Sequence, residues 1–310
     1  MKKILTLLLL VIGTGIASYA QKTKILLNLK LDSTYYLNQN SNLTITQEIP
    51  GHTQVITTLV GGLVAHKVTA IHDTVFEMAV QYESFLLKME MAGTTLMAID
   101  TKNNNSQNLM TRIMLGMLHK PIIMVITSKG KVLEVKNLEN LYAGMFDRFP
   151  ELTEAQKVQI KAQVEKSFGE KAFRNSLQDA FTVLPDAAVE VNDSWTSDTN
   201  LETVAVAKIK TNYTLKSINE QTYVIHGDAL VTSAGKADFI NSNNLPVRYN
   251  NMKGTYSVDV KLDKVTGWIT ELKTTKSVTG DMEIKDNPKI PGGMTFPMTI
   301  EGDITLSNSK

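Results

Sequence analysis

Apolar and polar residues alternate with a period of two along most of this 310-residue chain. The alternation, with frequent threonine and valine, runs through residues 21–136 and returns in residues 189–310. It predicts β-strands that are packed on one face and wet on the other. Such strands favour antiparallel sheets, because an antiparallel sheet can leave one side in water. Between these halves, residues 137–188 change to a helical period.

Long strands are predicted in the N-terminal β-rich half. Residues 51–68 are expected to form one long strand, or two strands that meet at a pair of glycines, and residues 75–91 another pair of strands. A glycine-containing turn predicts a hairpin between strands at residues 122–127 and 131–136. Most of this half is therefore expected to be sheet.

Helical spacing occurs in two places. Residues 109–118 carry apolar side chains at helical spacing, followed by a proline, and predict one helix inside the first half. In the middle third, an apolar stripe over residues 138–149 predicts a helix that Asn137 caps. Thr153 and Gln156 have the form of a capping box and open a second helix there. A third helical segment then extends to the next proline.

These patterns predict an α+β fold of long, curved antiparallel β-sheets in two halves, with a central helical insert. Residues 21–310 are expected to form one structural unit, made of the N-terminal half (21–136), the insert (137–188) and the C-terminal half (189–310). Long strands with one polar face are expected to curl around something apolar. The helices, the other half of the sheet and a ligand are the three candidates.

The N-terminal residues 1–20 predict a cleavable signal peptide. Two lysines supply positive charge, a short apolar stretch follows, and small residues precede the expected cleavage after Ala20. The apolar stretch is too short to span a bilayer, which needs about 20 apolar residues. We therefore expect an exported, soluble protein of the periplasm or the extracellular space, with no membrane span. Because no cysteine follows the leader, it is not expected to be a lipoprotein.

Charge and cysteine content exclude several classes of function. Lysine and arginine total 32 against 31 for aspartate and glutamate, so no net charge draws the chain to nucleic acid or to anionic lipid. The chain has no cysteine, which excludes thiol catalysis, zinc–cysteine sites and disulfides.

No enzyme motif is recognised in the sequence. The chain contains no H-E-x-x-H, G-x-S-x-G or G-x-G-x-x-G sequence and no phosphate loop. Ser233 and Lys236 match S-x-x-K in letters, but the S-D-N and K-T-G partners of that motif are missing. The histidines show no recognised metal-ligand spacing, although His66 and His72 would share a face if one continuous strand carried both. We predict no catalytic residues, no cofactor and no metal.

Methionine is concentrated in one part of the chain, since nine of the fourteen lie between Met78 and Met145. Three interpretations stay open. Thioethers can bind copper(I), helical spacing of several of these residues favours ordinary core packing, and methionine also adapts to varied apolar surfaces, which would suit a pocket for a lipid-like ligand. The third interpretation predicts that the pocket is lined by Met89, Met91, Met110, Met114, Met117 and Met124.

Several short motifs resemble those of a known family. They are Ala20-Gln21 after a lysine-led leader, Lys129-Gly130-Lys131-Val132, Asp193-Ser194-Trp195, and Asp263 with Thr266-Gly267. Together they look like a domain-of-unknown-function family of exported proteins from Bacteroidota, over most of the mature chain. That family has no assigned activity, so the resemblance implies no site residues. More loosely, long curved strands with helices inside are similar to the periplasmic lipoprotein carriers, whose half-barrels hold acyl chains.

The leading hypothesis is a non-enzymatic envelope protein that binds an apolar or lipid-like small molecule between the curved sheet and its helices. The alternative is a structural or interaction protein that binds another envelope protein through its sheet edges or polar strand faces. An unrecognised hydrolase is the third hypothesis.

Overall fold

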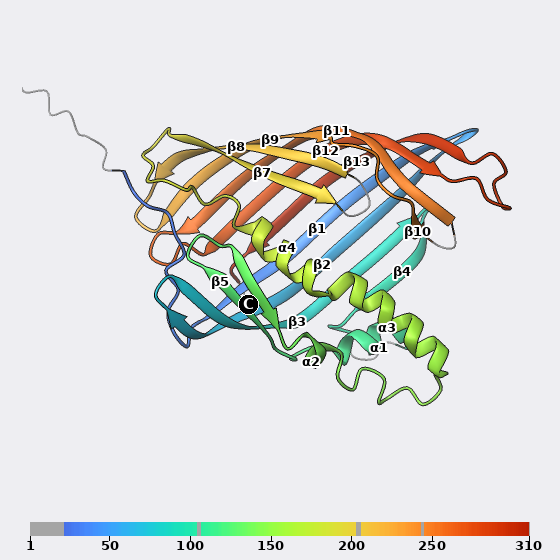
Figure 1. The fold of residues 1–310 in the computed structure, drawn as a ribbon, viewed down its shortest axis with the longest axis horizontal. Coiled ribbons are helices and arrows are strands. Elements are labelled where there is room, and N and C mark those ends of the chain that lie inside the picture. Colours follow the sequence, from blue (N-terminus) through green and yellow to red (C-terminus); the bar gives the residue numbers. More distant parts are fainter. Residues whose placement is uncertain (1–21, 104–106, 203–205, 243–244, 310) are drawn as a thin grey trace, which may run out of the picture.

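The computed structural model describes residues 22–103, 107–202, 206–242 and 245–309. The predicted signal peptide lies outside these described residues. Within them, the strands form a 13-stranded antiparallel sheet that is long and curved, and the helices lie against one of its faces (Figure 1). The α+β class is confirmed in broad terms, with strand dominating helix.

The N-terminal strands are β1 (Thr34–Ile49), β2 (His52–His72), β3 (Val75–Met91), β4 (Thr94–Asp100), β5 (Ile122–Thr127) and β6 (Val132–Lys136). The C-terminal strands are β7 (Ser194–Glu202), β8 (Val206–Ile218), β9 (Thr222–Ser233), β10 (Ile240–Ser242), β11 (Leu245–Asp263), β12 (Ile269–Ile284) and β13 (Met294–Ser307). The helices are α1 (Leu109–Leu115), α2 (Leu138–Tyr142), α3 (Glu154–Phe168) and α4 (Glu170–Ala180).

The two β-rich halves are joined into one continuous sheet, which corrects the prediction of separate curved sheets. The strand order is β6-β5-β3-β2-β1-β13-β12-β11-β9-β8-β7, with β4 paired to β3 and β10 paired to β11. The seam is the antiparallel pairing of β1 with β13, in which Ile45 lies opposite Ile300. Joining the halves removes two free sheet edges, which would otherwise leave rows of unpaired backbone groups.

Two segments of the first half are single strands. Residues 52–68 of the predicted segment 51–68 lie in β2 without a turn at the glycine pair, and residues 75–91 form β3 alone and not the predicted pair. A register shift between Leu63 and Val64, in the pairing with β3, lets β2 bend with the sheet without ending the strand. Gly62 pairs with Phe85 within the ladder. A Cβ atom at this position would lie 2.7 Å from the carbonyl oxygen of Ser84, so the two strand backbones are too close for a larger residue. The glycine therefore marks a close backbone approach and not a turn.

The helical insert follows the predicted pattern only in part. The capping box at Thr153 is confirmed, and α3 begins after it. The helix predicted over residues 138–149 ends at Tyr142, however, and turns replace its second half. Asn137 has a left-handed backbone (φ 58°) and its side chain makes no capping hydrogen bond, so the predicted cap was wrong. Gly144 also has a positive φ of 65°, which takes the chain out of helical geometry there.

The face of the sheet that contacts α4 is called the inner face below, and the opposite one the outer face. On β1 the inner face carries Tyr35, Leu37 and Gln39, and the outer face carries polar residues such as Asn38 and Asn40. The main core lies between the inner face and the helices. This arrangement confirms the prediction of strands with one packed face.

Trp268 lies at one end of this core and is fully buried. Its ring centroid is 5.1 Å from that of Tyr35 and 5.2 Å from that of Phe181, which follows α4. The indole N–H donates a hydrogen bond of 3.2 Å to the carbonyl oxygen of Tyr36, so its polar atom is satisfied despite burial.

No helix among the described residues is long and apolar enough to cross a bilayer.

Candidate functional site

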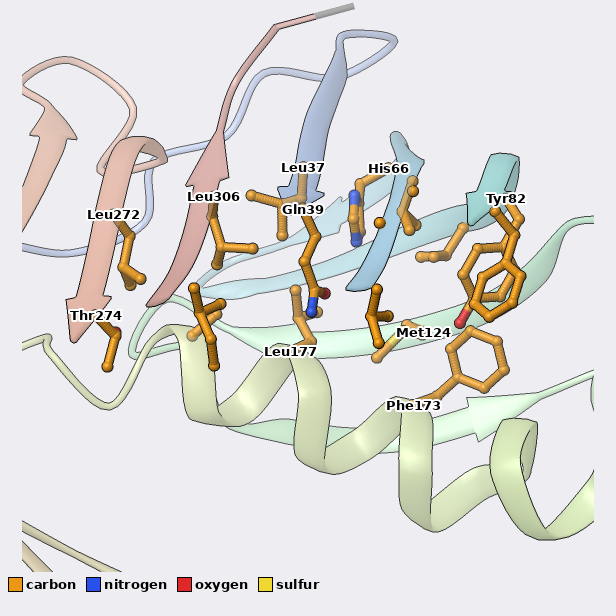
Figure 2. Close-up of a pocket in the computed structure, with 18 residues that line it drawn as sticks. Leu37, Gln39, His66, Tyr82, Met124, Phe173, Leu177, Leu272, Thr274 and Leu306 are labelled. Carbon is orange, nitrogen blue, oxygen red and sulfur yellow. The ribbon is translucent and has the colours of Figure 1, made fainter. Parts of the chain in front are cut away.

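A cavity of about 490 Å³ lies between the inner face of the sheet and α4 (Figure 2). It runs across the strands, from Leu272 and Thr274 on β12 to Tyr82 and Phe85 on β3. Its lining residues are Leu37, Gln39, Val60, Gly61, Gly62, Val64, His66, Val80, Tyr82, Phe85, Met124, Phe173, Leu177, Ala180, Leu272, Thr274, Ile304 and Leu306. Most of these side chains are apolar, so the cavity is suited to an apolar molecule.

The space exists because a glycine occupies the inner face of β2 under the helix. Gly62 lies opposite Gln39 on β1 and Phe85 on β3, so no side chain rises from the sheet between them. From the other side, Phe173 and Leu177 of α4 contact the sheet and hold the helix above this gap. The close approach of Gly62 to the Ser84 carbonyl prevents any larger residue without local movement.

One end of the cavity is aromatic. Phe173 lies with its ring centroid 5.6 Å from that of Tyr82, and Phe168 is 5.7 Å from Tyr82 in an edge-to-face arrangement. The ring centroid of Phe85 lies 5.4 Å from that of Phe168. Burial raises the pKa of the Tyr82 phenol, so it stays protonated at physiological pH. This end is closed by rings from both the sheet and the helices.

His66 is the most deeply buried polar group of the lining, with 3% of its surface exposed. Its Nδ1 atom has no hydrogen-bond partner among the described residues, and its ring lies 5.2 Å from that of Trp268. Burial lowers the pKa of His66 to about 4, since a charged imidazolium would lose its hydration. The imidazole is therefore neutral at pH 7.

Two further polar side chains line the cavity. Gln39 extends from β1 toward α4 and lies beside Leu177 in Figure 2. Thr274 lies at the end opposite the aromatic rings (Figure 2). Thr274 and Ile304 are half-buried, whereas His66 and Met124 are buried. Leu272, beside Thr274 at the same end, is buried.

The structure separates the six methionines that were predicted to line a pocket. Met124 of β5 lines the cavity. Met114 and Met117 are buried in the core around α1, and Met110 is partly buried against it. Met89 and Met91 are half-buried on β3, paired with Thr58 and Ile56 of β2. The six therefore do not converge on one site.

Most residues that line the cavity were not predicted from the sequence. Gln39 lies in the polar stretch 38–42 and Thr274 in the polar stretch 273–277, where the alternation is lost, so nothing in the pattern assigns either residue to the packed face. The glycine pair at residues 61 and 62 was the one available signal, since glycine inside a strand often marks a close backbone approach. His66 and His72 do not form a pair, because His72 is exposed at the end of β2. Among the described residues, no group of three or more histidine, aspartate or glutamate side chains could hold a metal ion.

Thirteen chains of solved structures match this chain, among them two of low identity. The first is described as "lipid-protein interactions in lipovitellin": it is 9% identical, with a TM-score of 0.43, and the match covers 91% of this chain but 26% of that one. The second is the COG4313 outer membrane channel from Pseudomonas putida F1, at 9% identity and a TM-score of 0.25, covering 90% of this chain and 97% of that one. This chain thus spans about a quarter of the lipovitellin chain.

No curated protein matches the chain. A family model does match, over residues 73–269, and it is described as a family of unknown function. The matched region runs from the start of β3 to the start of β12, so it includes the whole helical insert and most strands of the C-terminal half. The chain belongs to this family of unknown function, DUF6263.

Proposed function

We propose that this protein binds an apolar, lipid-like ligand in the cavity beneath α4, without catalysing a reaction. The observation that carries the proposal is the cavity itself, with its volume of about 490 Å³ and its largely apolar lining. Small-molecule sites typically have volumes of about 300–1,000 Å³ and apolar walls with a few polar groups. The cavity has this composition, and it lies where two structural layers meet.

The polar groups of the lining support binding in preference to chemistry. Gln39, His66 and Thr274 come from three different strands, and in the described part of the chain no hydrogen bond joins the side chains of any two of them. A hydrolase would need a nucleophile and a base within hydrogen-bonding distance of one another. Separate polar groups along an apolar wall instead suit the orientation of a ligand.

Export from the cytoplasm remains part of the proposal. It rests on the lysine-led leader in residues 1–20. A protein that shelters an apolar molecule from water is useful in an aqueous compartment next to a membrane. Detection of the mature chain, beginning at Gln21, in a periplasmic or extracellular fraction would support this location. Retention of the unprocessed chain in the cytosol would contradict it.

Binding can be tested with Nile red, an apolar dye whose fluorescence rises when it leaves water. We expect the wild-type protein to bind the dye, and Ala180→Phe to lose at least about tenfold in affinity, because the new ring would fill the cavity. Val158→Phe is the matched control, since it places the same phenyl ring on a helix at a residue that is 68% exposed. Circular dichroism would establish that both variants fold.

Two outcomes would contradict the proposal. One is a folded wild-type protein that does not bind Nile red and always has the bare chain mass in native mass spectrometry. The other is equal binding by the two variants, which would place the dye outside the cavity. In either case the hypothesis of an interaction protein would gain support, because β7 is a terminal strand of the sheet as described, and another protein could add a strand to it.

A further inference from the structure

A lysine lies on the inner face of the sheet just beyond the cavity. Lys276 follows Thr274 by two residues on β12, so the two side chains share a face. Its cross-strand neighbours are Gly302 on β13 and Tyr256 on β11. Lys276 thus lies next to the β12 end of the cavity, which is the end opposite the aromatic rings.

The position is unusual because the rest of this face is uncharged. On β1, β2, β11, β12 and β13, the pairing register places mainly apolar, hydroxyl, amide and histidine side chains on the inner face. In the described parts of these five strands, Lys276 is the one lysine, arginine, aspartate or glutamate on it. The outer face, in contrast, carries many charges. A lysine on the inner face therefore needs a specific explanation.

Lys276 is half-buried and has no ion pair or side-chain hydrogen bond in the described part of the chain. Desolvation lowers the pKa of its amine, and no charged group opposes that effect. Lys261, on the outer face of the adjacent strand, is instead paired with Glu271 at 2.6 Å. An ammonium that is partly removed from water without a partner costs free energy, which an incoming anion would recover.

The residue opposite Lys276 on β13 is a glycine, Gly302. Gly302 has a φ of 153°, and a Cβ atom there would lie 2.1 Å from the carbonyl oxygen of Asn42. The residue must therefore be glycine unless the backbone moves. As a result, the inner face has no side chain between Lys276 and Leu43, the next residue in the same cross-strand row. On the β13 side, therefore, no neighbouring side chain competes with a ligand for the Lys276 amine.

We propose that the ligand is an anionic amphiphile, whose carboxylate or phosphate head group pairs with Lys276 and whose chain lies in the cavity beneath α4. This inference rests on the proposed function and specifies the chemical class of the ligand. From β12 to β3 the cavity crosses four strand spacings, or about 19 Å. That length is comparable to an extended long-chain acyl group. Thr274 lies where the head group would meet the chain.

The test compares an acid with its neutral ester on the same protein. The probes are cis-parinaric acid, a fluorescent fatty acid, and its methyl ester. We expect Lys276→Met to weaken binding of the acid by about tenfold or more, because an ion pair is lost, and to leave binding of the ester nearly unchanged. Lys276→Arg should keep the preference for the acid. Lys261→Met, which removes an outer-face lysine, should affect neither probe.

Different results separate this inference from the proposed function. If the wild-type protein binds neither probe, the proposed function fails and this inference fails with it. If the ester binds but Lys276→Met lowers affinity for acid and ester equally, or for neither, this inference alone is overturned. Displacement of the probe by palmitate and by lysophosphatidate distinguishes a carboxylate from a phosphate head group. Stronger displacement by either anion than by neutral monoacylglycerol supports the proposal, provided that Lys276→Met abolishes the difference.

Discussion

Two regions of the inner face have the same strand pattern but different packing. In the covered region, beneath the helical insert, Trp268 and Ile225 are completely buried, and Leu177 and Phe181 from the insert complete the core. In the open region, around Ile300, the cluster consists of strand residues alone, and Ile300 and Tyr256 remain half-buried. Alternating residues thus determine which face is apolar, and the insert adds its own side chains to the core over part of that face, while Val231 and Val278 are buried in the open region without it.

The boundary between the two regions is where the candidate site lies. The cavity begins under α4, and Lys276 lies just outside it. A fully covered face would have no entrance, and a fully open one would not shelter an apolar chain from water. Partial cover of the inner face is therefore the feature that would let an apolar chain both enter the cavity and be sheltered there.

The largest effect is expected in the covered region. Trp268→Ala should lower the free energy of unfolding by about 3–5 kcal/mol, because it leaves a large void among packed rings and removes the hydrogen bond to Tyr36. Urea denaturation followed by circular dichroism measures this change. A loss below about 1 kcal/mol would show that the insert does not form a tight core with the sheet.

We expect acidic pH to lower the free energy of unfolding, because His66 is buried in the covered region. Its pKa in the folded protein is about 4, below the ordinary value of 6.5, so the unfolded chain binds a proton that the folded chain does not. The stability is intact above pH 6.5 and is lost as pH falls toward 4, by about 3 kcal/mol in total. Urea denaturation at several pH values measures the loss. His66→Gln should have a shallower pH dependence over the same window, and identical slopes would exclude His66 as the cause.

A matched pair of substitutions compares the two regions directly. Ile225→Ala removes a fully buried side chain in the covered region and should cost about 3 kcal/mol. Ile300→Ala removes the same atoms in the open region and should cost about 1 kcal/mol, because that side chain is only half-buried. Equal losses in urea denaturation would show that the open region is packed as tightly as the covered one.

The smallest expected effect is an increase, and not a decrease, in the free energy of unfolding. Lys276→Met should raise the free energy of unfolding of the ligand-free protein, by less than about 1 kcal/mol, because it removes an ammonium that has lost part of its hydration. Thermal unfolding measured by calorimetry would detect the increase. Lys261→Met should instead be neutral or slightly destabilising, since it breaks an exposed ion pair. A lower melting temperature for Lys276→Met would contradict the interpretation of its burial.

The sequence predicted individual strands better than their assembly. Alternation identified the packed face of β13, and the capping box located the start of α3, because both patterns are local. The pairing of Ile45 with Ile300 joins residues that are far apart in the chain, and no local pattern encodes it. The helix expected after Asn137 was too long because its apolar stripe persists through turns, where Met145 and Phe149 are still buried.

The site was less predictable than the fold. A half-buried lysine such as Lys276 has the same sequence context as an outer-face lysine, and only the register assigns it to the inner face. The methionines were difficult to assign to a core or to a pocket for a related reason. Residues such as Met114 satisfy the requirements of a core and of a pocket equally well, and the difference is decided by what packs against them.

The central seam has a consequence for how the chain acquires its structure. β1 and β13 are the first and last strands of the described chain, yet they are neighbours in the middle of the sheet. Contacts this distant in sequence slow folding, because a long loop must close before they form. Until β13 arrives, β1 carries an unsatisfied edge that another molecule could extend. Self-association should therefore be the main hazard during synthesis, and a chaperone that shields β1 would be expected to raise the yield of monomer.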